Sequence, residues 1–192
     1  MSFSKYEDFL QYLRTEELTS IPGTEQAKRW SATLTSDLGE RYEVFTPSMP
    51  NKQNAKYEEW KIWFDRHFKF LHDNLVLVGW SQGGYFLVKY LIENEMPVRI
   101  KGLCLVATPF QQEDFDGEDG GDFAFDTNKV SVLGEKANNI LIFHSKDDFV
   151  VPYEHALKYK AALPGAELIT FEDKNHFLIP EFPELIAKIK SF

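Results

Sequence analysis

The sequence predicts a three-layer α/β domain, in which helices cover both faces of a mostly parallel β-sheet. Short apolar runs, typical of strands buried on both faces, alternate along the chain with longer patterns of helical period. The chain has 192 residues, of which 43% are hydrophobic and 15% aromatic, and no repeat or linker interrupts it. That length and composition suit one domain with a substantial core, so we expect a single domain over residues 1–192.

Each expected element follows from the period of its apolar residues and from the caps and breakers at its ends. In the first half we expect a helix over 4–14, a short strand at 18–21 and a helix from a cap at Thr24 to a stop at Gly39. A strand at 42–46 should follow. A helix capped by Asn54 should then bury five apolar side chains, those of Tyr57, Trp60, Phe64, Phe68 and Leu71. Next come a strand at 75–78, a helix over 85–92, strands at 100–107 and 140–144, a helix over 153–163, a strand at 168–171 and a helix over 183–190.

Composition excludes several classes of function. The net charge of −9 argues against nucleic acid or an anionic membrane surface as a partner. The single cysteine permits no internal disulfide and suits a reducing compartment. The first ten residues carry charges and no apolar core, which does not fit a signal peptide, and no apolar run has membrane-spanning length. We therefore expect a cytoplasmic protein.

The most informative stretch is 74–84, which reads Asn-Leu-Val-Leu-Val-Gly-Trp-Ser-Gln-Gly-Gly. It places the pattern G-x-S-x-G between a buried strand and a helix, the context in which this pattern marks a nucleophilic serine. A tight turn would strain Ser81, expose its Oγ and require glycine on either side. The amide of Gln82, at the start of the helix, could then donate to an oxyanion. The alternative, a nucleotide-binding turn, lacks its own motifs here.

A serine nucleophile needs a base, and the base needs an orienting acid. Asp147 and Asp148 follow the strand at 140–144, and His176 follows the strand at 168–171. The order serine, acid, histidine is that of α/β-hydrolases. Because all three groups come after the carboxyl ends of parallel strands, we expect Ser81, one of the two acids and His176 on the same edge of the sheet.

The remaining candidate residues favour structural roles. His67 is expected to pack partly buried on a helix, His72 to lie in a polar turn and His155 to lie on an exposed helical face. His144 is favoured as structural, because a metal site with Asp147 or Asp148 would have no third ligand at suitable spacing. Cys104 lies inside an apolar run and is expected to be a buried, inert core residue. We expect neither metal nor cofactor.

An acidic segment at 111–126 interrupts the alternation, with seven carboxylates and no basic residue. A solvated surface loop is the favoured interpretation. A calcium loop fits poorly, because the required glycine and glutamate positions hold Asp119 and Phe125. The third interpretation is a flap over residues 108–128 that covers the site at the strand ends and packs through its phenylalanines.

Three blocks carry a resemblance to a known family. They are Met49-Pro50-Asn51 with Tyr57 and Trp60, then Gly79-Trp80-Ser81-Gln82-Gly83, then Asp148 with Pro152, joined to His176-Phe177 and Glu181-Phe182-Pro183-Glu184-Leu185. From about residue 42 to the C-terminus, the chain resembles the α/β-hydrolase superfamily and, within it, small serine hydrolases of the retinoblastoma-binding protein 9 type.

This resemblance implies a compact α/β-hydrolase fold without a separate cap domain, and hydrolysis of a carboxylic ester or amide of a small substrate. It implies Ser81 as nucleophile, His176 as base and Asp148 as orienting acid, with Gln82 and Gly23 as the oxyanion hole. The serine motif also resembles carboxylesterases and acyl-protein thioesterases, which are the alternative enzymes. A non-catalytic binding protein on the same fold is the alternative of a different class.

Overall fold

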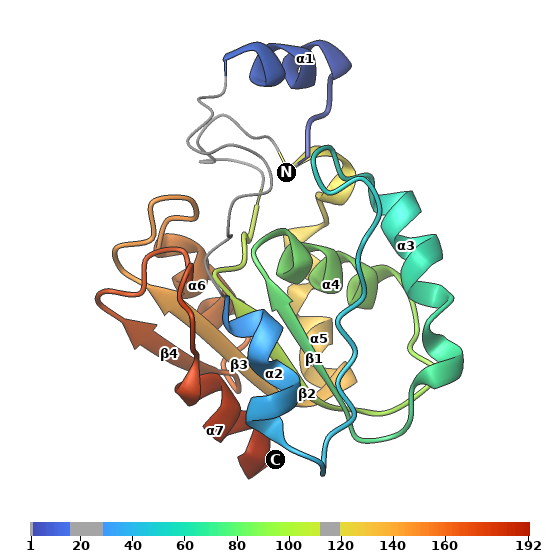
Figure 1. Ribbon diagram of the computed structural model, residues 1–192, viewed down its shortest axis with the longest axis vertical. Helices are drawn as coiled ribbons and strands as arrows, with labels where there is room; N and C mark the ends of the chain where they lie inside the picture. The colour runs from blue at the N-terminus through green and yellow to red at the C-terminus, as the bar shows by residue number, and fades with distance from the viewer. Residues whose placement is uncertain (1, 16–28, 112–119) are drawn as a thin grey trace.

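A computed structural model describes residues 2–15, 29–111 and 120–192. Four strands and the helices around them form the body of the molecule (Figure 1). The first half contains α1 (Tyr6–Thr15), α2 (Trp30–Leu38), α3 (Tyr57–Asp65), the 3₁₀ turn η1 (Phe68–Phe70), β1 (Leu75–Trp80) and α4 (Gln82–Glu93). The second half contains β2 (Ile100–Val106), η2 (Gly121–Phe123), η3 (Thr127–Val132), α5 (Leu133–Lys136), β3 (Ala137–Ser145), α6 (Glu154–Ala162), β4 (Glu167–Phe171) and α7 (Pro183–Ser191).

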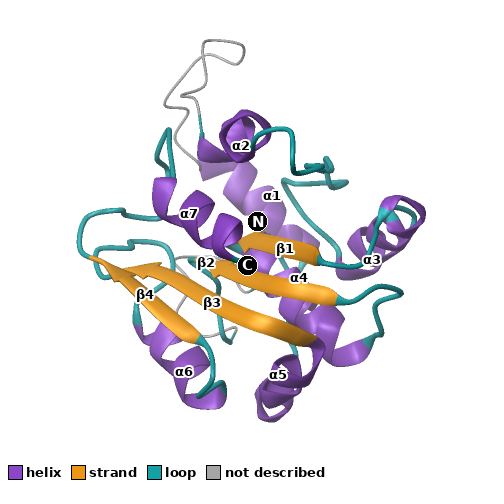
Figure 2. Ribbon diagram, turned by 90° about the horizontal axis from the view of Figure 1, so that it is seen from below, coloured by secondary structure: helices purple, strands orange, loops and turns teal. Residues whose placement is uncertain are grey.

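The sheet has the order β1-β2-β3-β4, and each neighbouring pair of strands is parallel. Helices α2 and α7 cover one face, and α4, α5 and α6 cover the other (Figure 2). Successive residues of β2 alternate between these layers, with Cys104 in the cluster of α2 and α7 and Leu105 in the cluster of α4. The prediction of a three-layer α/β domain with a parallel sheet is confirmed.

The two apolar layers are rich in aromatic rings. On the side of α2 and α7, Phe182 is 1% exposed and packs edge-on against Trp30 and Phe143. On the other side, Phe123 is fully buried against Trp60, with ring centroids 5.2 Å apart. Edge-to-face pairs of this kind stabilise a core beyond the area that they bury.

The expected strand at 42–46 is wrong. These residues join no strand ladder, and β1 is therefore the edge strand of the sheet among the described residues. A cavity of about 970 Å³ lies beside this edge, lined in part by Val44, Leu77, Leu34 and Phe64. Strand propensity produces a strand only where a partner offers free backbone groups at the right distance, and no described segment does so here. The expected strand at 18–21 and the cap at Thr24 lie outside the described residues.

The start of α3 also differs from the expectation. Asn54 does not cap this helix; its Oδ1 instead accepts the N–H of Phe3 at 3.3 Å. The helix begins at Tyr57, whose N–H donates to the carboxylate of Asp122 at 3.0 Å. A distant carboxylate thus satisfies one of the free N–H groups of the first turn and lies favourably at the positive end of the helix. The helix ends at Asp65, so Phe68 lies in η1.

The described end of the acidic segment is anchored to the core. Phe123 is fully buried, Asp122 bonds the start of α3, and Asp126 accepts the N–H of Asn128 at the start of η3. A solvated loop is therefore the wrong description of residues 120–126. Five of its seven carboxylates lie outside the described residues, and the proposed flap is untested there. No helix in the described ranges is long and apolar enough to span a membrane.

Candidate functional site

Ser81 occupies the turn between β1 and α4. Its backbone has φ 51° and ψ −121°, a left-handed conformation that a residue with a side chain seldom adopts. The Ser81 N–H donates to the carbonyl of Val106 at 2.9 Å, and its carbonyl accepts the N–H of Tyr85 at 3.1 Å. The strand on one side and the helix on the other hold the strained residue in place, as the sequence pattern predicts.

The glycines around Ser81 differ in whether a side chain would fit at their position. A Cβ on Gly79 would lie 2.5 Å from the Cα of Gly84, so the two backbones cross where no side chain fits. A Cβ on Gly84 would collide with the hydroxyl of Thr108. A Cβ on Gly83 would meet nothing within 4 Å. The expectation that glycine is required on both sides of Ser81 is therefore wrong for Gly83, which lies in the first turn of α4 and borders the cavity.

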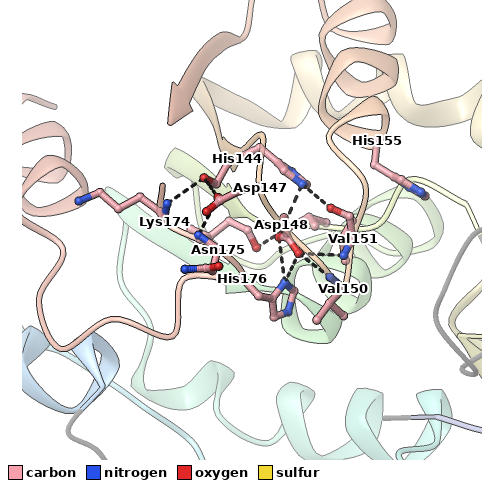
Figure 3. Close-up of polar contacts among 12 residues, drawn as sticks. His144, Asp147, Asp148, Val150, Val151, His155, Lys174, Asn175 and His176 are labelled. Atoms are coloured by element: carbon pink, nitrogen blue, oxygen red, sulfur yellow. Dashed lines mark hydrogen bonds and ion pairs between the residues drawn. The ribbon is translucent and has the colours of Figure 1, made fainter. Parts of the chain in front are cut away.

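Asp148 and His176 meet at the carboxyl ends of β3 and β4 (Figure 3). Nδ1 of His176 lies 3.0 Å from Oδ1 and 2.9 Å from Oδ2 of Asp148. The Asp148 side chain is fully buried, and the His176 side chain is 8% exposed. The same carboxylate accepts the N–H groups of Val150 and Val151, both at 2.9 Å. This arrangement fixes the carboxylate and leaves Nε2 of His176 free of it.

Asp147 points in another direction. Its Oδ1 accepts the hydroxyl of Ser145 at 2.5 Å and the N–H of Asn175 at 2.9 Å. The Ser145 hydrogen bond, helped by that of Asn175, holds the pKa of the Asp147 carboxyl below its ordinary value. The amides of Val150 and Val151, in the same turn, bond Asp148. Asp147 ties the loop after β3 to the loop that carries His176.

Two tryptophans connect the serine turn to the histidine loop. Nε1 of Trp80 donates to the carbonyl of His176 at 3.0 Å, and the two rings lie 5.7 Å apart. Nε1 of Trp30 donates to the carbonyl of Phe177 at 3.2 Å. Trp80 immediately precedes Ser81, so its indole brings the backbone of His176 to the nucleophile turn. Sequence reasoning missed this role, although Trp80 stands inside the G-x-S-x-G motif.

The structure shows no hydrogen bond between the candidate nucleophile and base. In the described part of the chain, Ser81 Oγ makes no hydrogen bond to His176. Such contacts are often long without substrate and tighten in the reacting complex. The first N–H of α4, from Gln82, follows Ser81 directly, while Gly23 lies outside the described residues.

The other candidate residues are structural. His155 is buried rather than exposed, and its Nδ1 accepts the N–H of Phe110 at 2.8 Å. It faces inward because α6 packs against the residues that follow β2 as well as against the sheet. His67 is partly exposed and bonds the carbonyl of Trp63 at 2.7 Å. Cys104 is buried, which raises the pKa of its thiol to about 12 and confirms an inert core residue.

The described residues offer no group of three side chains that could hold a metal ion.

The cavity beside β1 is separate from the pair formed by Asp148 and His176. It borders Trp80 and Gly83, but Ser81, Asp148 and His176 do not line it. The reactive groups thus lie at the strand ends, whereas the cavity follows the unpaired edge of β1.

Comparison with solved structures identifies the fold. The ydeN gene product from B. subtilis matches with a TM-score of 0.66, 23% identity, 76% of this chain covered and 79% of that chain. A meta-cleavage product hydrolase (CumD) from Pseudomonas fluorescens matches with a TM-score of 0.54, 14% identity and coverage of 75% and 72%. The strained serine turn, the parallel sheet and these neighbours define an α/β-hydrolase fold.

The chain belongs to the serine hydrolase family, whose family model matches residues 20–181. No curated protein matches the chain.

Proposed function

We propose that the protein hydrolyses a carboxylic ester or amide of a small substrate through an acyl-enzyme formed on Ser81. The observation that carries this proposal is the Asp148–His176 pair, held beside the strained serine turn by the hydrogen bond from Trp80 to His176. A positive φ at a residue with a side chain costs about 1–3 kcal/mol and persists where the surrounding structure requires it. A buried carboxylate bonded to an imidazole is the second half of a serine triad.

In this mechanism, Ser81 Oγ attacks the acyl carbon while Nε2 of His176 takes its proton. Asp148 keeps the proton of the neutral ring on Nδ1 and stabilises the imidazolium that forms. The negative oxygen of the tetrahedral intermediate accepts the backbone N–H of Gln82 at the start of α4. His176 then returns its proton to the leaving group, and a water molecule attacks the acyl-enzyme by the same route. The chemistry needs no cofactor.

Within the family, the type that we propose is that of retinoblastoma-binding protein 9, and carboxylesterases and acyl-protein thioesterases are the alternative enzymes. A non-catalytic binding protein is the alternative of another class, since a fold alone does not establish activity. The intact Ser81, Asp148 and His176 favour an enzyme. The second oxyanion donor is the group on which the two classes differ, and its candidate, Gly23, lies outside the described residues.

The test is a panel of p-nitrophenyl esters of graded chain length, together with a thioester. We expect the wild type to hydrolyse at least the short esters, and Ser81→Ala to lose about six orders of magnitude in kcat, the loss typical of a triad acting as a unit. Ser36→Ala is the matched control, because its exposed hydroxyl on α2 bonds only locally. Full activity in Ser81→Ala would contradict an acyl-enzyme on Ser81. A wild type that hydrolyses no member of the panel would favour the non-catalytic binding protein.

A further inference from the structure

His144 is the last residue but one of β3, and it lies next to Asp148, the acid of the candidate triad. Its side chain is buried, and Nε2 lies 2.8 Å from the carbonyl oxygen of Val151. The same nitrogen lies 3.7 Å from Oδ2 of Asp148 (Figure 3). The ring of Tyr153 packs edge-on at 5.9 Å and closes the other side. The imidazole thus lies between the carboxylate and the turn that follows it.

The hydrogen bond to Val151 fixes the tautomer of this ring. A carbonyl oxygen only accepts, so Nε2 of His144 carries the proton and donates it. Nδ1 has no hydrogen-bond partner among the described residues. Burial lowers the pKa of His144, and the opposing effects of the Val151 bond, Asp148 and Glu154 do not overcome it, while a charged His176 lowers the pKa further. The ring is therefore neutral at neutral pH.

Val151 is held from both sides. Its N–H donates to Oδ1 of Asp148 at 2.9 Å, and its carbonyl accepts the proton of His144. The neighbouring N–H of Val150 reaches the same carboxylate oxygen. The direction of these two N–H groups, and hence the direction of the carboxylate, depends on how firmly the turn is fastened. Among the described residues, His144 is the side chain that fastens the Val151 carbonyl.

We propose that His144 is a positioning residue for the reaction, which fastens the turn at Val151 so that Asp148 keeps the orientation that holds His176. The expected effect on turnover rests on the proposed function, whereas the positioning of Asp148 by His144 holds whether or not the protein is an enzyme. A neutral donor suits this place, because it orients the acid without adding a second positive charge that would compete with the imidazolium of His176. In metal sites, the groups that orient a ligand contribute about 10–100-fold to affinity or activity, and we expect an effect of that order here.

The experiment compares three variants with the wild type. His144→Leu removes the donor at similar volume, and His144→Gln keeps an N–H that can reach Val151. His155→Leu is the matched control, since His155 is equally buried and bonds a backbone group, yet stands apart from the dashed contacts around Asp148 in Figure 3. The readouts are kcat and KM across pH, and the downfield proton resonance of the His176 Nδ1–H bonded to the carboxylate.

For His144→Leu we expect kcat to fall by about 10–100-fold with little change in KM. The acid limb of its pH–rate profile should move to lower pH, because a loosened carboxylate stabilises the imidazolium less. The Nδ1–H resonance should weaken or move upfield. His144→Gln should recover most of kcat and the resonance. His155→Leu should lose stability while keeping the acid limb and the resonance of the wild type.

The two proposals can fail separately. If the wild type hydrolyses no ester but His144→Leu still loses the Nδ1–H resonance, the proposed function fails and the positioning role stands. If Ser81→Ala abolishes turnover while His144→Leu keeps the wild-type kcat, acid limb and resonance, the positioning role fails alone. Should His144→Leu not fold, His144→Phe, which keeps a ring but lacks the N–H donor, takes its place. A wild-type kcat, acid limb and resonance in His144→Phe, or equal changes in the His155 control, would overturn the positioning role.

Discussion

The two sides of β1 are built differently. On one side, β2, β3 and β4 continue a parallel ladder, and the loops at their carboxyl ends carry Asp148 and His176 within a dense set of hydrogen bonds. On the other side, no described strand pairs with β1, and a cavity of about 970 Å³ is lined by β1 and by residues 42–46. Ser81 lies at the boundary between these two sides.

This contrast separates two requirements of the proposed reaction. The ladder side supplies the acid and the base, and it does so through contacts that the described residues make among themselves. The second oxyanion donor is expected at Gly23, which lies outside the described residues. We therefore expect nucleophile activation to depend on the loops that follow β3 and β4 and not on the open side of β1.

The largest effect is expected at the acid. Asp148→Asn should lower kcat by about four orders of magnitude, because an amide stabilises the wrong tautomer of His176. Asp147→Asn should mainly lower stability, since Asp147 bonds Ser145 and Asn175 rather than the imidazole. Steady-state kinetics and chemical denaturation of both variants check this pair. A larger catalytic loss at Asp147 would place the orienting acid one residue earlier.

The next effect compares packing in the core of the ladder side with packing on the open side of β1. Phe182→Ala should cost about 3–5 kcal/mol of unfolding free energy, because the ring is 1% exposed and packs against Trp30, Phe143 and Phe177.

Phe45→Ala is the control for the open side. That ring is 44% exposed and stacks only on the exposed Phe70, so its loss should cost under about 1 kcal/mol. Urea denaturation of the two variants measures the difference. Equal losses would mean that residues 42–46 pack as tightly as the core and would remove the contrast between the two sides.

The smallest effect is expected at the glycines of the serine turn. Gly79→Ala should destabilise by about 1–3 kcal/mol and reduce activity, since its Cβ would press on the backbone of Gly84. Gly83→Ala should be neutral or stabilising by up to about 1 kcal/mol, because its Cβ enters open space in a helix. Thermal unfolding and ester hydrolysis together test the pair. A costly Gly83→Ala would show that the cavity side of α4 is closed.

Much of the fold could be predicted from the sequence because buried parallel strands leave continuous apolar runs. All four described strands lie within or around the runs expected for them. His176 pairs with Asp148, the acid chosen from the sequence, rather than with Asp147. That choice came from the resemblance, because the residues alone left both acids open.

The wrong predictions for the cap of α3 and for His155 share a physical cause, which is that the contacting residues are distant in sequence. The capping carboxylate of α3 comes from Asp122, which no local pattern around Asn54 can reveal. His155 is buried because it shares a face of α6 with Tyr159, whose hydroxyl bonds the carbonyl of Pro109 after β2. The strand at 42–46 fails for the opposite reason, since its propensity finds no described partner.

The most direct test of the central claim is labelling with a fluorophosphonate, which modifies activated serines, followed by peptide mapping of the site. The account predicts one label per chain, on Ser81, that is lost in Ser81→Ala and greatly slowed in Asp148→Asn, while Ser36→Ala labels like the wild type. A label on another serine, or a folded wild type that takes up none, would contradict the claim that Asp148, His176 and the strained turn activate Ser81.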